Sequence, residues 1–191
     1  MLIELGISAR HVHLNREAID LLFGEGYELT NFKDLKQLGQ FAANEKVEVH
    51  GPKGSFAGVR ILGPARRINQ VEVSVTDCIK LGVLPVLRDS GDIADTPGAV
   101  LVGPKGRIEL KEGVIVAARH AHFSVETATK EGITDGDRLC ASVLGNREVE
   151  FRNVLARVDA SYVDELHLDT DEANGALAKD NQRIEITKCQ K

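Results

Sequence analysis

The sequence predicts a mainly β fold with short α-helices, arranged as a small barrel or sandwich. Apolar residues recur in short alternating runs that are typical of half-buried strands, and turn residues separate these runs. Two Gly-Pro-Lys-Gly segments, at 51–54 and 103–106, indicate tight connections between strands. Long helical periodicity is scarce, so any helices are expected to be short.

Strands are expected where β-branched and aliphatic residues alternate with polar ones between turn signals. The predicted strands cover residues 1–8, 46–50, 55–62, 69–75, 99–102, 107–110, 138–144, 148–158 and 165–168. Helices are expected after residues that can cap a helix N-terminus. The predicted caps are Asn15 before a helix over 16–23, Ser124 before a helix ending near Glu131, Thr76 before a helix to Leu81, and Thr170 before a last helix.

The composition is that of an ordinary globular protein with 191 residues, enough for one large domain or two small ones. A net charge of −5 with 4% aromatic residues argues against a nucleic-acid-binding surface. No apolar run reaches the length of about 18 residues that a membrane span needs, and no secretory signal pattern is found. The three cysteines are far apart, so reduced thiols and a cytoplasmic location are expected.

Two motifs of the form Arg-His-x-His stand out, at residues 10–13 and 119–122. In a strand, side chains two residues apart share one face and lie roughly 7 Å apart, so both imidazoles can reach one metal ion. A single pair is more often a surface or core feature, but these motifs hold four of the six histidines. They also lie 109 residues apart with Ser124 in the place of Asn15, which indicates an internal repeat whose flanks do not visibly match.

Further ligands for such a site can be sought among the remaining polar residues. His167 lies between two leucines, which is more typical of a packed core histidine, and Glu72 fits the polar face of an alternating strand. Arg60, Arg66 and Arg67 form a basic cluster just before Glu72. Guanidinium groups match the geometry of phosphate oxygens, but a charged surface loop explains the cluster equally well.

Four motifs in this order resemble those of the PduL-type phosphate acyltransferases, also named phosphate propanoyltransferases. They are Ser8-Ala9-Arg10-His11-Val12-His13-Leu14, Gly63-Pro64-x-Arg66 with Gln70-Val71-Glu72, Ala118-Arg119-His120-x-His122, and His167-x-Asp169-Thr170-Asp171-Glu172-Ala173-Asn174. The resemblance extends from Ser8 to about Leu177.

The resemblance implies two small β-barrels capped by short helices, with a metal site at the interface between them. One barrel is expected to comprise 1–9 and 118–191, and the other 10–117. Two zinc ions per chain are implied, and Arg66 is implied to hold orthophosphate. The implied ligands are His11, His13 and Glu72 for one ion and His120, His122 and His167 for the other; the implied coenzyme A contacts are Ser8, Ala9, Arg10, Arg60 and Asn174.

The implied activity is reversible transfer of a propanoyl or acetyl group between coenzyme A and orthophosphate. The expected partners are therefore acyl-coenzyme A and phosphate, without nucleic acid or membrane, in a chain that can form a homo-oligomer such as a dimer. Relatives inside bacterial microcompartments commonly carry an N-terminal targeting extension, whereas seven residues precede Ser8 here, so a cytoplasmic location is expected. The alternatives are a binuclear zinc hydrolase and a non-catalytic module stapled by zinc.

Overall fold

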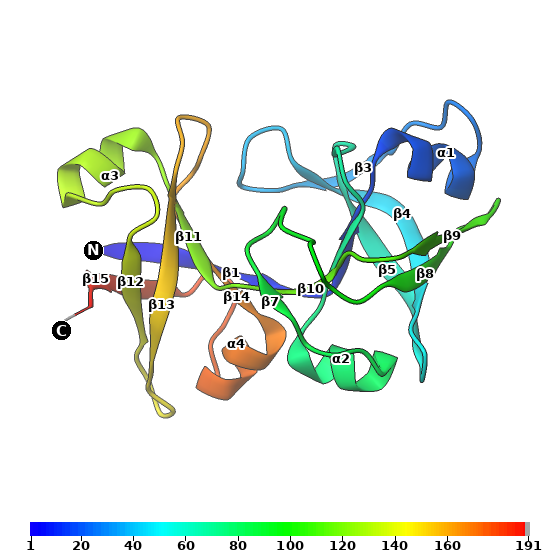
Figure 1. The fold of residues 1–191 in the computed structure, drawn as a ribbon. Helices are drawn as coiled ribbons and strands as arrows, with labels where there is room; N and C mark the ends of the chain where they lie inside the picture. Colours follow the sequence, from blue (N-terminus) through cyan, green and yellow to red (C-terminus); the bar gives the residue numbers. More distant parts are fainter. Residues whose placement is uncertain (190–191) are drawn as a thin grey trace. The chain divides into compact units, whose positions relative to one another are not determined.

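The computed structural model describes residues 1–189, and its chain divides into two compact units (Figure 1). The first unit comprises Met1–Ser8 together with the chain from Ala118 onward, and the second unit comprises Ala9–Ala117. Each unit has its own hydrophobic core. Within residues 1–189, no helix combines the length and apolarity needed to span a lipid bilayer.

The first unit is a closed β-barrel whose strands follow the order β1-β14-β11-β13-β12-β15. β1 pairs in parallel with β14 and antiparallel with β15, so the start of the chain completes a barrel built from its C-terminal part. Leu5, Phe123 and Leu166 lie in its core. The elements are β1 Leu2–Ser8, β11 His120–Phe123, α3 Val125–Glu131, β12 Arg138–Val143, β13 Val149–Val158, β14 Glu165–Asp169, α4 Thr170–Ala176 and β15 Arg183–Lys188.

The second unit is a curled sheet in the order β7-β10-β6-β2-β5-β4-β8-β9, with β3 paired to β4. Val12, Ile61 and Val71 lie in its core. The elements are β2 His11–His13, α1 Arg16–Phe23, β3 Asn31–Asp34, β4 Phe41–His50, β5 Ser55–Gly63, β6 Gln70–Glu72, α2 Val75–Leu81, β7 Leu87–Arg88, β8 Ala99–Val102, β9 Arg107–Leu110 and β10 Val114–Ala117.

The predicted mainly β fold with short helices is confirmed. The helices after the two His-x-His motifs also begin and end where their caps predicted. The Asn15 side chain accepts a hydrogen bond from the backbone N–H of Ala18, and Ser124 accepts one from Thr127. Both interactions satisfy a backbone donor that the first helical turn leaves unpaired.

The caps predicted for the other two helices were wrong. Ser74, not Thr76, caps α2, because Ser74 and Asp77 form a reciprocal capping box. This box ends β6 at Glu72, so the strand predicted over 69–75 is shorter than expected. Likewise Asp169, not Thr170, caps α4 and forms the equivalent box with Glu172.

The expectation of reduced thiols was wrong for two of the three cysteines. Cys140 and Cys189 form a disulfide with an S–S distance of 2.12 Å. β12 and β15 are antiparallel neighbours in which Cys140 lies opposite Thr187, and this pairing brings Cys189 close to Cys140. Their separation of 49 residues conceals this proximity in the sequence. Cys78 is 1% exposed and packs in the core of the second unit.

The two units share a local arrangement around the His-x-His motifs. In the second unit β2 pairs in parallel with β5 and antiparallel with β6. In the first unit β11 pairs in the same two ways with β13 and β14. The repeat extends to backbone conformation, since Gly58 of β5 and Asn153 of β13, 95 residues apart, both have positive φ, at 68° and 59°.

Candidate metal centres

The second unit brings His11, His13 and Glu72 together. His11 and His13 project from one face of β2, and Glu72 lies opposite His11 on β6. The Nε2 atoms of the two histidines are 3.2 Å apart. Glu72 Oε2 lies 3.5 Å from His11 Nε2, and Glu72 Oε1 lies 3.6 Å from His13 Nε2. All three side chains are buried, and Glu72 is 7% exposed, so it does not belong to a solvated face.

These separations fit a bound divalent cation. Donor atoms about 2.0–2.1 Å from a tetrahedral zinc ion lie about 3.3 Å from each other. The Nδ1 atom of His11 lies 2.8 Å from the carbonyl oxygen of Ala9, which orients the ring so that Nε2 faces the other donors. His13 Nδ1 is buried and has no hydrogen-bond partner in the described part of the chain.

The electrostatics at Glu72 and His13 favour metal ligation at neutral pH. Burial raises the pKa of the Glu72 carboxyl, but His11 and His13 outweigh burial and hold that pKa well below its usual range. Burial lowers the pKa of His13 to about 4. Burial also lowers the pKa of His11, but Glu72 outweighs this effect and the net pKa is raised. An ionised carboxylate and a neutral imidazole are the protonation states that bind metal.

The Glu72 carboxylate is held by a small polar network. Gln70 Nε2 donates to Glu72 Oε1 at 2.7 Å, and Ser90 Oγ donates to the same oxygen at 2.8 Å. The backbone N–H of Gly91 donates to Gln70 Oε1 at 2.8 Å, which fixes the Gln70 amide. Gln70 and Ser90 were missed as site residues. The alternation along 70–72 gives a signal for Gln70, because it shares a strand face with Glu72.

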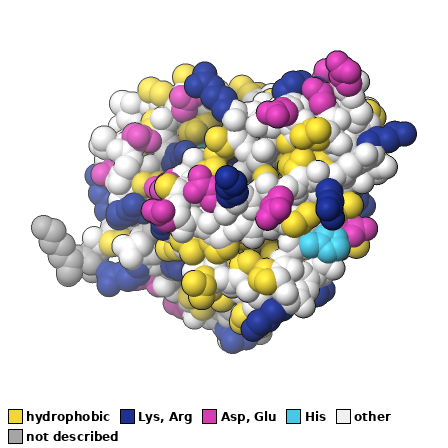
Figure 2. Space-filling model, turned by 45° about the vertical axis from the view of Figure 1, so that its right-hand side comes forward, with side chains coloured by type: hydrophobic (Ala, Val, Ile, Leu, Met, Phe, Trp, Pro, Cys, Tyr) yellow, Lys and Arg dark blue, Asp and Glu magenta, His cyan; other side chains and the backbone are white. Residues whose placement is uncertain are grey.

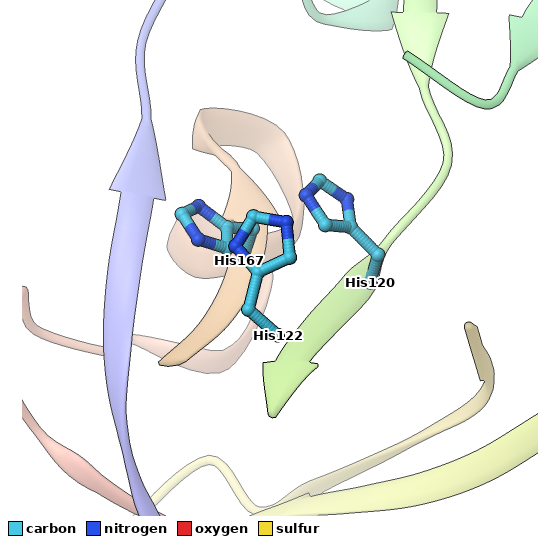
Figure 3. A group of neighbouring side chains, drawn as sticks. All are labelled: His120, His122 and His167. Carbon is cyan, nitrogen blue, oxygen red and sulfur yellow. The ribbon is translucent and has the colours of Figure 1, made fainter. Parts of the chain in front are cut away.

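The first unit brings together His120, His122 and His167 (Figure 3). His120 lies opposite His167 across β11 and β14, as His11 lies opposite Glu72 in the second unit. The three ring centroids are separated by 4.9–5.0 Å. His167 is half-buried with its ring in this cluster, although Leu166 and Leu168 pack in the core.

Donor chemistry in this cluster also suits a cation. Burial lowers the pKa of His122 to about 3, with further lowering by His167 and His120, so its ring is neutral at pH 7. Nδ1 of His122 is buried without a hydrogen-bond partner among residues 1–189. The Nδ1 atom of His120 lies 2.9 Å from the carbonyl oxygen of Ala118, which repeats the contact between His11 and Ala9. Tyr162, which sequence reasoning missed, stacks on His122 with centroids 4.2 Å apart.

Arg66 lies close enough to the second-unit cluster for its charge to act there. It is half-buried in the loop after β5, and its backbone N–H donates to the carbonyl oxygen of Leu14 at 2.8 Å. The Arg66 guanidinium lowers the pKa of both His11 and His13 through its positive charge. The neighbouring Arg67 side chain is exposed. The structure therefore distinguishes Arg66 from Arg67 at this cluster.

Each arginine of the Arg-His-x-His motifs forms an ion pair with a carboxylate in the first turn of a helix. Arg10 pairs with Asp77 through two hydrogen bonds of 2.7 and 3.0 Å, and its guanidinium lies 4.2 Å from the centroid of Phe56. Arg119 pairs with Glu172 at 2.7 Å. Both carboxylates are third residues of capped helices, a role that sequence reasoning missed. These pairs hold the motifs against α2 and α4.

The structure places the other predicted coenzyme A contacts as follows. Arg60 lies opposite His11 on β5, donates to the carbonyl oxygen of Ala43 and covers the ring of Phe32. Ser8 ends β1. Ala9 is exposed, and Asn174 is exposed on α4. Ser8 and Asn174 belong to the first unit, whereas Ala9, Arg10 and Arg60 belong to the second unit.

Comparison with known proteins identifies the family of this chain. A family model described as phosphate propanoyltransferase matches residues 4–179. A phosphate propanoyltransferase of Thermotoga maritima is 48% identical over 185 residues, which cover 96% of this chain and 88% of that protein. The protein of the same name from Rhodopseudomonas palustris is 47% identical over 186 residues, covering 97% and 82% of the two chains. The chain therefore belongs to the phosphate propanoyltransferase family of enzymes.

Proposed function

We propose that the protein is a zinc-dependent phosphate acyltransferase that moves a propanoyl or acetyl group between coenzyme A and orthophosphate. Family membership supports the acyl transfer, and two donor triads, of which that in the second unit is fully buried, support the metal dependence. The observation that carries the proposal is the second-unit cluster of His11, His13 and Glu72, because a guanidinium lies within electrostatic reach of it. The cluster therefore has donors for a cation and a nearby group that can hold an anion.

The proposed reaction is a direct transfer. An oxygen of orthophosphate attacks the thioester carbonyl carbon, a C–O bond forms and the C–S bond breaks. The electron pair of the C–S bond leaves with the coenzyme A sulfur, and the products are acyl phosphate and the thiol after one proton is taken up. Cys78 is buried in the hydrophobic core and cannot serve as an accessible acyl acceptor. A route through an acyl-cysteine at Cys78 is therefore not part of the proposal.

Two zinc ions are assigned, one to His11, His13 and Glu72 and one to His120, His122 and His167. Zinc, when bound, supplies a Lewis acid for the carbonyl oxygen and a borderline-soft partner for the thiolate. Three protein donors leave a coordination position open, whereas structural zinc sites are usually closed by four. This donor count favours a catalytic role over that of a structural staple.

Arg66 is assigned the role of holding orthophosphate. Its planar fork can donate to two phosphate oxygens at once and so can fix the direction of attack. The proposed coenzyme A contacts remain Ser8, Ala9, Arg10, Arg60 and Asn174. Since Arg10 is already bonded to Asp77, it would contribute mainly through its 41% exposed side chain and its fixed position.

Replacing Glu72 with glutamine is expected to weaken metal binding at this triad by about 100-fold or more. Loss of a residue that only contacts a ligand typically weakens binding by about 10–100-fold, and loss of a charged ligand should weaken it more. Glu72→Gln retains the size and one acceptor oxygen for Gln70, but removes the charge that offsets a divalent cation. Zinc competition with a chromophoric chelator measures the affinity. Glu109→Gln, at an exposed position on β9, is the matched control. Wild-type affinity in Glu72→Gln would contradict its assignment as a ligand.

The proposed function is tested by measuring zinc content together with coenzyme A release from acetyl- and propanoyl-coenzyme A. Release is expected to require both zinc and orthophosphate, with acyl phosphate as the second product. Thioester cleavage that proceeds equally well without phosphate would instead identify a zinc hydrolase. Bound zinc without turnover of either substrate would identify a structural module.

A further inference from the structure

A buried carboxylate lies beside the three-histidine cluster of the first unit. Glu165 is 6% exposed and lies two residues before His167, on the same face of β14. Its Oε2 atom is 3.2 Å from His167 Nε2, so Nδ1 is the ring nitrogen of His167 that is left for a cation. The Glu165 charge also acts on His122, whose pKa it raises against the stronger effect of burial. Burying a carboxylate is costly, and its position beside these rings places a negative charge at the cluster.

The second unit has a neutral residue at the matching position. Gln70 lies two residues before Glu72, as Glu165 lies two residues before His167, and the two pairs are 95 residues apart. In the second unit the cluster residue Glu72 is charged, and Gln70 is a neutral amide. In the first unit the cluster residue His167 is an imidazole, and Glu165 carries the charge. Each pair therefore supplies one carboxylate to its cluster.

The backbone beside Glu165 is shaped to admit this carboxylate. Gly6 on β1 lies opposite His167, and a Cβ at Gly6 would be 2.8 Å from Glu165 Oε1 and 3.0 Å from its Cδ. The matching position in the second unit is Ile115, which lies opposite Glu72 and is 0% exposed. Gly6 and Ile115 each lie five residues before the first histidine of a motif. Gly6 therefore leaves room for the Glu165 carboxylate, which a side chain at this position would displace.

We propose that Glu165 is a positioning residue that supplies the negative charge of the first-unit metal centre through His167. This inference rests on the proposed metal binding of the function above. A carboxylate beside a ligating histidine fixes the ring and raises its basicity, and its loss typically costs 10–100-fold in metal affinity. Glu165 thereby offsets the positive charge of the cation without binding the metal itself, whereas Glu72 offsets it as a ligand.

The test measures Zn²⁺ affinity in a His11→Ala background, in which the first-unit centre is expected to be the remaining site. Adding Glu165→Gln is expected to weaken binding by about 10–100-fold. Adding Gly6→Ala instead, which removes no charged group, is expected to weaken binding in the same direction by displacing the carboxylate. Glu150→Gln, at an exposed position on β13, is the control and should leave the affinity unchanged.

Two further readouts separate positioning from other roles. Co²⁺ bound in place of Zn²⁺ should keep its visible absorption spectrum in Glu165→Gln, because the ligands are retained; a spectrum showing one donor fewer would overturn the positioning role. Zinc should raise the thermal midpoint of Glu165→Gln less than that of its parent, while the metal-free midpoint is not lowered. A lowered metal-free midpoint with unchanged affinity would mean a purely structural Glu165. Failure of wild-type protein to bind zinc would overturn the proposed function itself.

Discussion

His11→Ala is expected to remove about one zinc ion per chain and nearly all turnover, because opening a three-donor site weakens both affinity and geometry. His11 is central to its cluster: its Nε2 lies 3.2 Å from His13 and 3.5 Å from Glu72. Its loss also leaves the Glu72 carboxylate with less compensating charge in a buried position. Zinc content and phosphate-dependent coenzyme A release from the same preparation provide the measurement.

His50→Ala is the matched control for this variant. His50 lies in the same unit at the end of β4, where a partly exposed ring pairs with Glu48 at 2.8 Å and belongs to neither cluster. It should therefore retain two zinc ions and wild-type turnover. Figure 2 shows one face of the molecule, on which side chains of both charge signs are interspersed. Full zinc content and normal activity in His11→Ala would remove the first motif from the metal site.

Local signals were sufficient for part of the fold. Asn15 and Ser124 could be identified as caps because each is followed by a short segment without Gly or Pro and then by a glycine. The cap of α2 was misplaced because Ser74 and Thr76 are both good capping residues. The spacing of Ser74 and Asp77 distinguishes them, since a carboxylate three residues after the cap completes a capping box.

Long-range pairing could not be read from the sequence in this way. The His-x-His pairs follow from strand alternation, but the proximity of Glu72 to His11 depends on β2 and β6 pairing across 61 positions. The spacing of residues carries no record of that register, and the resemblance to known enzymes was needed to name Glu72 and His167. The disulfide was missed for the same reason, because β12 and β15 bring its cysteines together.

The second half of the internal repeat also could not be recognised from the sequence. The segments around Phe56 and Phe151 share the 95-residue offset and the same pairing with a His-x-His strand. Few identities survive between them, since packing requires only an apolar residue of suitable size at most core positions. The conformation is retained where the side chain differs, as the positive φ of Gly58 and Asn153 shows.

Arg66→Ala is expected to raise the apparent KM for phosphate and to lower kcat by about a hundredfold, the cost of misplacing a reacting group. Zinc content should stay unchanged, because the arginine lies beside the donors and is not one of them. Arg66→Lys keeps a positive charge but replaces the rigid fork with a mobile point charge. It should therefore show smaller effects on both constants than alanine.

Arg67→Ala separates a phosphate grip from a general effect of positive charge in this loop. Arg67 has an exposed side chain, whereas Arg66 is half-buried and its charge reaches His11 and His13. Removing the Arg67 charge should therefore leave KM for phosphate close to wild type. Since both variants lose one positive charge, a difference between them measures the position of the guanidinium. If Arg67→Ala lost most of its activity while Arg66→Ala kept its dependence on phosphate, Arg67 and not Arg66 would hold the phosphate.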